Sequence, residues 1–227
     1  MLAYVSLWSA DLLALGEAVD EIGSLVAGFH IDVFDGHNAR ELLFGPDLVT
    51  ALANRTSTLI DVHLNVTEPD YWIDRFADAG AGMITVQSTP CTSVAHTLTH
   101  IRQRNVSPSL GLELHEPVSL AIEHFSLIDR VLLLGTEIGV KGRQLDPGTP
   151  GRVRELVAAR AGTAPLVVVD GGIRRHTAPL IAEAGADGVV PGSLVFEDGA
   201  PAAAVAAISA LPSGCAASRA PDFWRTV

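Results

Sequence analysis

The sequence alternates short runs of apolar and β-branched residues with amphipathic segments of helical length, and this alternation constrains the fold more than any other feature. We expect strands in the runs Leu2–Trp8, Gly28–Val33, Thr58–Val66, Met83–Gln87, Ser109–Leu114, Arg130–Gly135, Pro165–Val169 and Gly188–Val190. Helical periodicity is clearest in the segments Pro69–Ala79, Val94–Arg104, Val153–Ala161 and Thr177–Ala184. Eight such strand–helix units favour a single-domain α/β fold, the (β/α)8 or TIM barrel.

A weak internal repeat supports parallel strands that each follow a helix. Gly80 stops a helical segment shortly before the strand at Met83, and Gly185 does the same before Gly188. An open, doubly wound sheet is the alternative. No GxGxxG motif follows the first strand, so a dinucleotide-binding version of that sheet has little support.

No linker or low-complexity break divides the chain before Leu211. We therefore expect the barrel to occupy residues 1–211 and an irregular C-terminal tail to follow at residues 212–227. Phe223 and Trp224 in that tail are available to dock on the barrel or on a partner.

Composition limits the partners and the compartment. The chain has 15 basic and 26 acidic residues and a formal net charge of −11, whereas broad nucleic-acid binding needs a basic surface. Any phosphate must then be bound locally. No apolar stretch approaches the roughly 18 residues of a membrane span, and the spacing of Cys91 and Cys215 fits neither a disulfide framework nor a metal site. We expect a cytoplasmic protein that binds neither nucleic acid nor membranes.

Polar residues stand at the ends of three of the expected strands. His30 and Asp32 share one face of the second strand, Asp61 and His63 share one face of the third, and Asp170 ends the seventh. Each one alone is consistent with a core residue or a helix cap. Together, two imidazoles and two carboxylates suit Zn²⁺, Fe²⁺ or Mn²⁺. Asp61 is either a residue that orients a ligand or a structural acceptor, and these alternatives have equal weight.

Glycines form a second cluster at the same end of the barrel. Gly171-Gly172 follows the seventh strand, Gly192-Ser193 follows the eighth, and the segment 139–143 follows the sixth. Loops after the last strands of a barrel frequently bind phosphate through backbone N–H groups. Ordinary βα turns are also rich in glycine, so this interpretation is supported by position rather than by composition.

Four blocks of sequence resemble the ribulose-phosphate 3-epimerase family. HIDVFDGHNARELLFGP resembles its HxDVMDGHFVPNLTFGP motif, and DVHLNVTEPDYWIDRFADAGAGMITVQ resembles DxHLMVxxPxxYIxxFxxAGAxxITxH. VVVDGGIRRHTAPLIAEAGADGVVPGSLVF and VSLWSADLLALGEAV are similar to its VDGGI and SILSADF blocks. The blocks occur in the family's order from Val5 to about Ile208.

The resemblance implies a (β/α)8 barrel, an oligomer, a sugar-phosphate substrate and one divalent ion such as Zn²⁺, Fe²⁺, Mn²⁺ or Co²⁺. It implies that His30, Asp32, His63 and Asp170 bind the metal, and that Asp32 and Asp170 also act as the acid and base. Ser6 would contact the substrate, while Gly171, Gly172, Gly192 and Ser193 would bind its phosphate. The implied reaction inverts C3 of a ketose phosphate.

Departures from the family pattern lie around the expected substrate. Phe34, Asn65 and Leu134 occupy positions where the family commonly has methionine. The sixth-strand loop reads EIGVKGR rather than NPGFGGQ, so Gly139, Lys141 and Gly142 are expected to contact the substrate. Lys141 and Arg143 add charge near the phosphate or near a second anionic group, unless they are solvated surface. The segment Asn38–Glu41 replaces the usual FVPN. We therefore expect the same reaction type on ribulose 5-phosphate or on a related tetrulose, pentulose or hexulose phosphate.

Two other functions remain open at this point. A sugar-phosphate decarboxylase or aldolase can use the same barrel, but such relatives carry a DxKxxD motif and neither HIDVFD nor DVHLNV contains lysine. A non-catalytic phosphosugar-binding homologue is the other alternative, and the intact set of expected ligands disfavours it.

Overall fold

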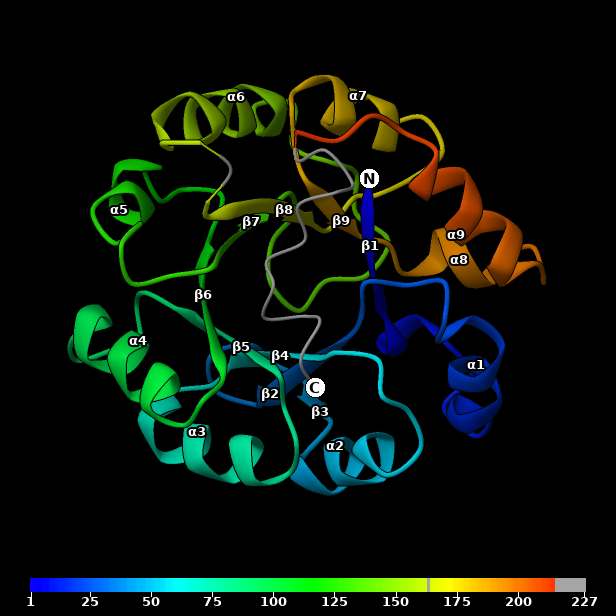
Figure 1. Ribbon diagram of the computed structural model, residues 1–227, viewed down its shortest axis with the longest axis horizontal. Helices are drawn as coiled ribbons and strands as arrows, with labels where there is room; N and C mark the ends of the chain where they lie inside the picture. The colour runs from blue at the N-terminus through cyan, green and yellow to red at the C-terminus, as the bar shows by residue number, and fades with distance from the viewer. Residues whose placement is uncertain (163, 215–227) are drawn as a thin grey trace.

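The computed structural model describes residues 1–162 and 164–214, in which eight parallel strands close into a barrel (Figure 1). The barrel strands are β1 (Leu2–Ser6), β2 (Gly28–Asp35), β4 (Ile60–Asn65), β5 (Met83–Gln87), β6 (Ser107–Leu112), β7 (Arg130–Leu134), β8 (Leu166–Asp170) and β9 (Gly188–Val190). Consecutive strands pair in parallel, and β1 pairs with both β2 and β9, which closes the ring. The predicted single-domain (β/α)8 barrel is confirmed.

Helices form the outer ring around these strands (Figure 1). They are α1 (Leu15–Ile22), α2 (Pro46–Ala53), α3 (Pro69–Asp78), α4 (Val94–Gln103), α5 (Ser119–Ile122), α6 (Thr149–Ala159), α7 (Ala178–Glu183), α8 (Ser193–Phe196) and α9 (Pro201–Ser209), with a 3₁₀ turn η1 (Leu7–Ser9) after β1. Five of them carry proline in their first turn, where its missing N–H costs no helical hydrogen bond. Among the residues described, no helix combines the length and apolarity needed to cross a membrane.

The structure shifts several predicted boundaries. The first strand ends at Ser6 rather than Trp8, because the chain turns there into η1. The strand expected from Ser109 to Leu114 begins at Ser107 and ends at Leu112. A short strand β3 (Leu42–Leu43), which pairs antiparallel with β2, was not predicted because two residues carry no periodicity.

The predicted boundary between residues 211 and 212 stays a prediction. Residues 215–227, which include Cys215, Phe223 and Trp224, lie outside the described part of the chain. Cys91 is a free thiol.

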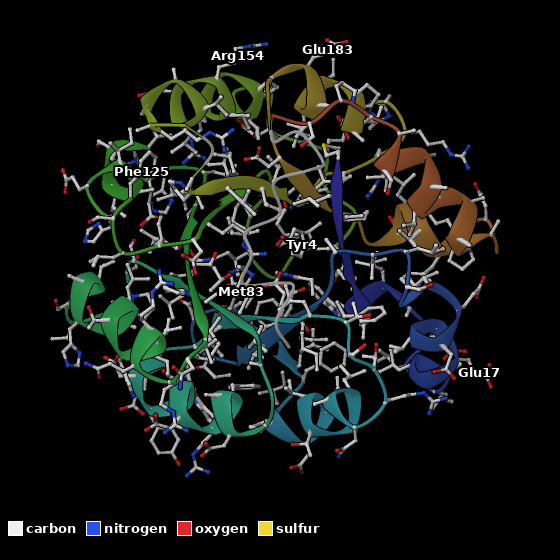
Figure 2. The ribbon with its side chains drawn as sticks, viewed as in Figure 1. Tyr4, Glu17, Met83, Phe125, Arg154 and Glu183 are labelled. Atoms are coloured by element: carbon white, nitrogen blue, oxygen red, sulfur yellow. The ribbon has the colours of Figure 1, made fainter. Side chains whose placement is uncertain are left out.

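The apolar core has two parts, one on each side of the strands. The larger lies between the strands and the helices. The smaller fills one half of the barrel interior and consists of Tyr4, Leu132, Leu134, Leu166, Val168 and Val190. Figure 2 shows Tyr4 and Met83 inside the ring and Glu17, Arg154 and Glu183 at its outer surface. The other half of the interior contains buried polar and charged side chains, among them Asp61, Thr85, Ser109 and Arg130.

One aspartate holds two loops together at the carboxyl rim. Asp35, the last residue of β2, accepts hydrogen bonds from the backbone N–H groups of His37 at 2.9 Å and Asn38 at 3.1 Å. Its other oxygen accepts from the backbone N–H of Thr67 at 2.7 Å and from the Thr67 hydroxyl at 2.9 Å. The loop after β2 is thereby fixed to the loop after β4.

These contacts predict an acid-sensitive contribution to stability. Burial opposes ionisation of Asp35, but the hydrogen bonds from Thr67, His37 and Asn38 outweigh it and lower the pKa from 3.8 to about 2. A lowered pKa stabilises the folded state above the unfolded value of 3.8, and that contribution disappears as the pH falls through about 2. Urea unfolding at several pH values should show Asp35→Asn less stable than wild type near neutrality, with the difference shrinking between these two pH values. A difference that is constant with pH would contradict this account.

Candidate active site

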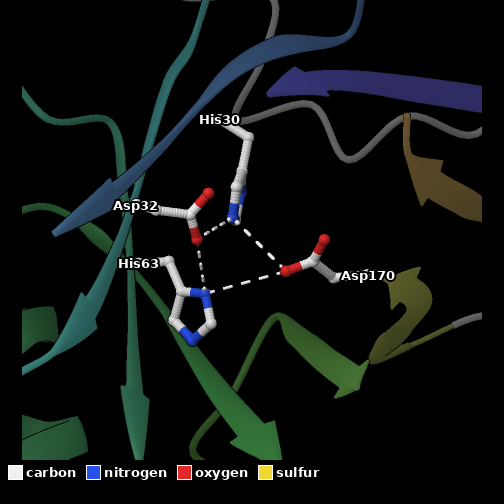
Figure 3. Close-up of side chains that lie close together, drawn as sticks. All are labelled: His30, Asp32, His63 and Asp170. Carbon is white, nitrogen blue, oxygen red and sulfur yellow. Dashed lines mark ion pairs between the residues drawn. The ribbon is translucent and has the colours of Figure 1, made fainter. Parts of the chain in front are cut away.

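Four polar side chains from three strands meet at the carboxyl end of the barrel (Figure 3). His30 and Asp32 alternate on β2, His63 is the register partner of Asp32 on β4, and Asp170 ends β8. Asp32 Oδ1 lies 3.4 Å from His30 Nε2 and 3.3 Å from His63 Nδ1. Asp170 Oδ2 lies 3.8 Å and 3.9 Å from the same two nitrogens. The four residues that the sequence singled out therefore form one cluster.

The cluster fits a divalent metal ion. One ligand atom from each side chain lies within 4.8 Å of all the others. His30 Nε2 and His63 Nδ1 are buried, and neither has a hydrogen-bond partner within residues 1–162 and 164–214. Buried nitrogens of this kind require a partner, and two imidazoles with two carboxylates form a donor set suited to first-row divalent ions.

A buried ion pair lies directly behind His30. Asp61, on the same inward face of β4 as His63, accepts from His30 Nδ1 at 2.7 Å. The guanidinium of Arg130, at the start of β7, donates to both oxygens of Asp61 at 2.7 Å and 2.6 Å. It also donates to the hydroxyls of Thr85 at 2.7 Å and Ser109 at 3.1 Å. Burial opposes protonation of His30, but Asp61 and Asp32 outweigh burial and raise the pKa of His30 well above 6.5. Nδ1 is thereby engaged by Asp61, and Nε2 is the nitrogen that faces the cluster, where a metal ion would replace its proton.

His63 is held by a second polar group. The Gln87 amide, at the end of β5, contacts His63 Nε2 at 2.7 Å. This contact is made by the amide nitrogen of Gln87, and the amide oxygen has no hydrogen-bond partner among the described residues. Turning the amide by half a rotation places this oxygen against Nε2–H, which satisfies both groups and leaves Nδ1 as the His63 nitrogen that faces the cluster.

The two carboxylates of the cluster have different proton affinities. Burial opposes ionisation of Asp32, but its contacts with His30 and His63 outweigh burial and hold its pKa well below the usual range. The Ser6 hydroxyl donates to the second oxygen of Asp32 at 3.3 Å. Asp170 has weaker contacts, and burial together with the neighbouring charge of Asp32 raises its pKa to about 6. One group is therefore a base and the other a partly protonated acid near neutrality.

A cavity of about 310 Å³ opens above the cluster. It is lined by Asp32, His63 and Asp170 and by all the other residues expected to contact substrate, namely Ser6, Gly139, Lys141, Gly142, Gly171, Gly172, Gly192 and Ser193. His30 is the one expected site residue that does not line the cavity, because it lies beneath the cluster with 0% of its surface exposed.

The paired glycines after β8 are required by the backbone. Gly171 has a φ of 89° and Gly172 a φ of 71°, which side chains with a Cβ rarely adopt. A Cβ at Gly172 would also lie 2.6 Å from the backbone nitrogen of Leu145 in the neighbouring loop. The turn therefore exposes backbone towards the cavity where an anion can approach it.

The loop after β7 reaches across the cavity mouth. Lys141 Nζ donates to the backbone oxygen of Trp8 at 2.6 Å and lies 4.4 Å from the centroid of its ring. Burial lowers the pKa of Lys141, although the charges of Asp32 and Glu41 oppose this effect. Lys141 thus carries its charge over the open side of the site.

Sequence reasoning missed several residues of this site. It did not single out Arg130, Gln87 or Trp8, although a charged residue at the start of an apolar strand and an amide at the end of one were visible signals. It left the role of Asp61 open, and the contacts with His30 and Arg130 favour the orienting role.

Residues 3–196 match the family model described as the ribulose-phosphate 3 epimerase family. A ribulose-phosphate 3-epimerase of Bacillus subtilis (strain 168) is 37% identical over 196 residues, covering 84% of this chain and 90% of the relative. The ribulose-phosphate 3-epimerase of Rhodobacter capsulatus is 36% identical over 197 residues, covering 86% and 85%.

Solved structures of lower identity share the fold. A 3-hexulose-6-phosphate synthase from Salmonella typhimurium superposes with a TM-score of 0.69 at 18% identity, covering 92% of this chain and 97% of that one. Orotidine 5'-phosphate decarboxylase from Pyrococcus horikoshii OT3 superposes with a TM-score of 0.67 at 14% identity, covering 100% of both chains. At these identities the similarity concerns the barrel alone.

The ion pair behind His30 predicts that removing the Asp61 carboxylate strongly destabilises the protein, and that a second substitution at Arg130 restores part of the stability. Asp61→Asn should cost about 3–5 kcal/mol, because it leaves the guanidinium of Arg130 buried without a carboxylate. The double variant Asp61→Asn/Arg130→Met should recover a large part of that loss, since no unpaired charge remains buried. Urea unfolding of the wild type and the two variants measures the change in the free energy of unfolding for each variant. Equal losses in the single and the double variant would show that the ion pair is not the source of the effect.

Proposed function

The chain belongs to the ribulose-phosphate 3-epimerase family, and from this membership we propose that it is an isomerase that inverts C3 of a ketose phosphate. Ribulose 5-phosphate and related tetrulose, pentulose and hexulose phosphates are the proposed substrates. The observation that carries the proposal is geometric: Asp32 from β2 and Asp170 from β8 converge with His30 and His63 on one cluster beside the cavity.

Inversion next to a ketone requires removal of the C3 proton from one face and return of a proton to the other. Asp32, held ionised by His30 and His63, takes the proton, and the C–H electron pair moves towards the C2 carbonyl oxygen to give an enediolate. Asp170, which approaches from β8, donates a proton in its protonated form to the opposite face of C3. In the reverse direction the two carboxyl groups exchange these roles.

A divalent ion held by His30, Asp32, His63 and Asp170 would supply positive charge to stabilise the negative charge that develops on the substrate oxygens. We propose Zn²⁺, Fe²⁺, Mn²⁺ or Co²⁺, since nitrogen and carboxylate donors suit all four.

The far end of the cavity suits a phosphate group. The turn at Gly171 and Gly172 exposes backbone there, and Gly192 and Ser193 line the adjacent wall. The Ser193 hydroxyl is buried and has no partner within the part of the chain that the structure describes. Lys141 adds a cation at the mouth. A phosphate bound here fixes C3 between the two carboxyl groups and contributes binding energy away from the reacting carbon.

We also propose a homo-oligomer in the cytoplasm. Family membership supports the compartment. Exposed apolar side chains in the connections that follow β1 and β2 support association, with Leu12 52%, Leu13 99% and Leu42 81% exposed.

The decarboxylase or aldolase alternative has less support. Neither β2 nor β4 carries a lysine, and the inward positions are filled by His30, Asp32, His63 and their neighbours. Both acid/base groups are present in the cluster, which also disfavours a protein that only binds phosphosugars.

Proton transfer at C3 is the direct test. In deuterated buffer the wild-type protein should exchange the C3 hydrogen of D-ribulose 5-phosphate or a related ketose phosphate, followed by NMR. Asp32→Asn and Asp170→Asn should each reduce the exchange rate by at least about 100-fold, because general acid–base catalysis is worth that much or more. Asp47→Asn, an exposed carboxylate in the first turn of α2, serves as the control and should exchange at the wild-type rate. Exchange that survives in both cluster variants would reject the proposal.

Metal binding should appear as added stability. A divalent ion at 100 times its Kd stabilises the folded state by about 2.7 kcal/mol, which corresponds to a rise of roughly 5–10 °C in thermal midpoint for a chain of this size. Calorimetry of metal-stripped protein with added Mn²⁺ or Zn²⁺ should show this rise. His63→Gln should remove most of it, whereas His115→Gln, a surface histidine with 74% of its side chain exposed, should not. An equal rise in both variants would place the metal elsewhere.

A further inference from the structure

The Asn65 side chain is a buried amide in the wall of the cavity. It ends β4 two residues after His63, so both side chains point into the barrel, with Asn65 nearer the rim. Only 1% of its surface is exposed, and it lines the cavity. Neither Oδ1 nor Nδ2 has a hydrogen-bond partner in residues 1–162 and 164–214.

Such an amide is costly unless a ligand satisfies it. A buried polar group without a partner destabilises a protein, and the Asn65 side chain presents two such atoms. On the strands beside β4, Phe34, its register partner on β2, is apolar, and the Gln87 amide at the end of β5 contacts His63 rather than Asn65. Because the amide lines the cavity, a ligand bound there is positioned to supply its hydrogen-bond partner.

Asn65 lies opposite the proposed phosphate site. Around the closed ring, β4 and β8 are separated by three strands in either direction. The turn at Gly171 and Gly172 follows β8, while Asn65 ends β4. The cluster that includes His63 and Asp170 lies between these two walls. A ligand whose phosphate contacts the glycine turn and whose reacting carbon lies over the cluster extends its other end towards Asn65.

We propose that Asn65 is a specificity-determining residue that binds the 1-hydroxyl of the substrate, and so selects hydroxymethyl ketones over methyl ketones among phosphorylated ketoses. This inference rests on the proposed function, because it uses the position of C3 between Asp32 and Asp170. In a ketose phosphate the atoms beyond C2, on the side away from the phosphate, are C1 and its hydroxyl. A hydroxyl can donate to the amide oxygen and accept from the amide nitrogen.

The test compares two sugars that differ in that hydroxyl alone, D-xylulose 5-phosphate and 1-deoxy-D-xylulose 5-phosphate. The wild-type protein should exchange the C3 hydrogen of the hydroxylated sugar with a kcat/KM about 10- to 100-fold above that of the deoxy sugar, because the deoxy sugar leaves the buried amide unpaired. Asn65→Leu, similar in size but without hydrogen-bonding atoms, should reduce this ratio to about threefold or less. Asn65→Met, the residue common in the family at this position, should do the same and is the second variant if leucine disturbs the barrel.

A structural role alone would lower the exchange of both sugars together and leave their ratio unchanged, which would overturn the proposal. A further readout needs no catalysis. Without sugar, Asn65→Leu should be at least as stable to urea as wild type, since it removes an unpaired amide from the interior. A variant that is clearly less stable would mean that the protein itself satisfies the amide.

The two proposals fail in different ways. Exchange of the hydroxylated sugar with equal ratios in wild type and Asn65→Leu would leave the epimerase intact and reject the role of Asn65. Absence of exchange with either sugar would contradict the proposed function, and calorimetric Kd values for the two sugars would then decide on Asn65. Equal Kd values, or binding of neither sugar, would reject its role as well.

Discussion

The ion pair between Arg130 and Asp61 is the interaction on which the site depends. Both side chains are fully buried inside the barrel, where an isolated charge is strongly unfavourable. The guanidinium spans the interior from β7 and bonds to groups on β4, β5 and β6, while the Tyr4 ring lies 5.0 Å from it. The carboxylate that Arg130 neutralises is the one that orients His30. The groups around Arg130 thus form one hydrogen-bonded network that ends at His30, a member of the four-residue cluster.

That network separates two kinds of environment within a few ångströms. Asp32 is surrounded by imidazoles and stays ionised, whereas Asp170, 19% exposed at the end of β8, is farther from both rings and has its pKa raised to about 6. The barrel thereby gives two identical functional groups opposite tendencies to hold a proton. Since the two residues come from separate strands, this difference depends on closure of the ring by the β1–β9 and β1–β2 pairings.

The sequence predicted the barrel and the cluster because both leave local signals. Strands buried on both faces are nearly continuous apolar runs, and the polar residues that interrupt them, such as His30 and Asp170, stand out. Period-two alternation was enough to place His30 with Asp32. It could not pair Arg130 with Asp61, which are 69 residues apart and meet only across the closed interior. The missing partners of Asn65 were likewise invisible, because the absence of a contact is a property of the packed structure rather than of any segment. The two-residue strand β3 was too short to leave a pattern.

The placement of the binding groups on different strand–helix units has a consequence for how this enzyme can diverge. Asn65 sits at the tip of β4, across the ring from the glycine turn after β8, and it contributes no atom to the four-residue cluster. With the roles that we propose, a substitution at this position changes which sugars are accepted and leaves the groups for phosphate binding and proton transfer in place. On this assignment selectivity and reactivity lie on different strands of one scaffold, in parts that can be mutated separately.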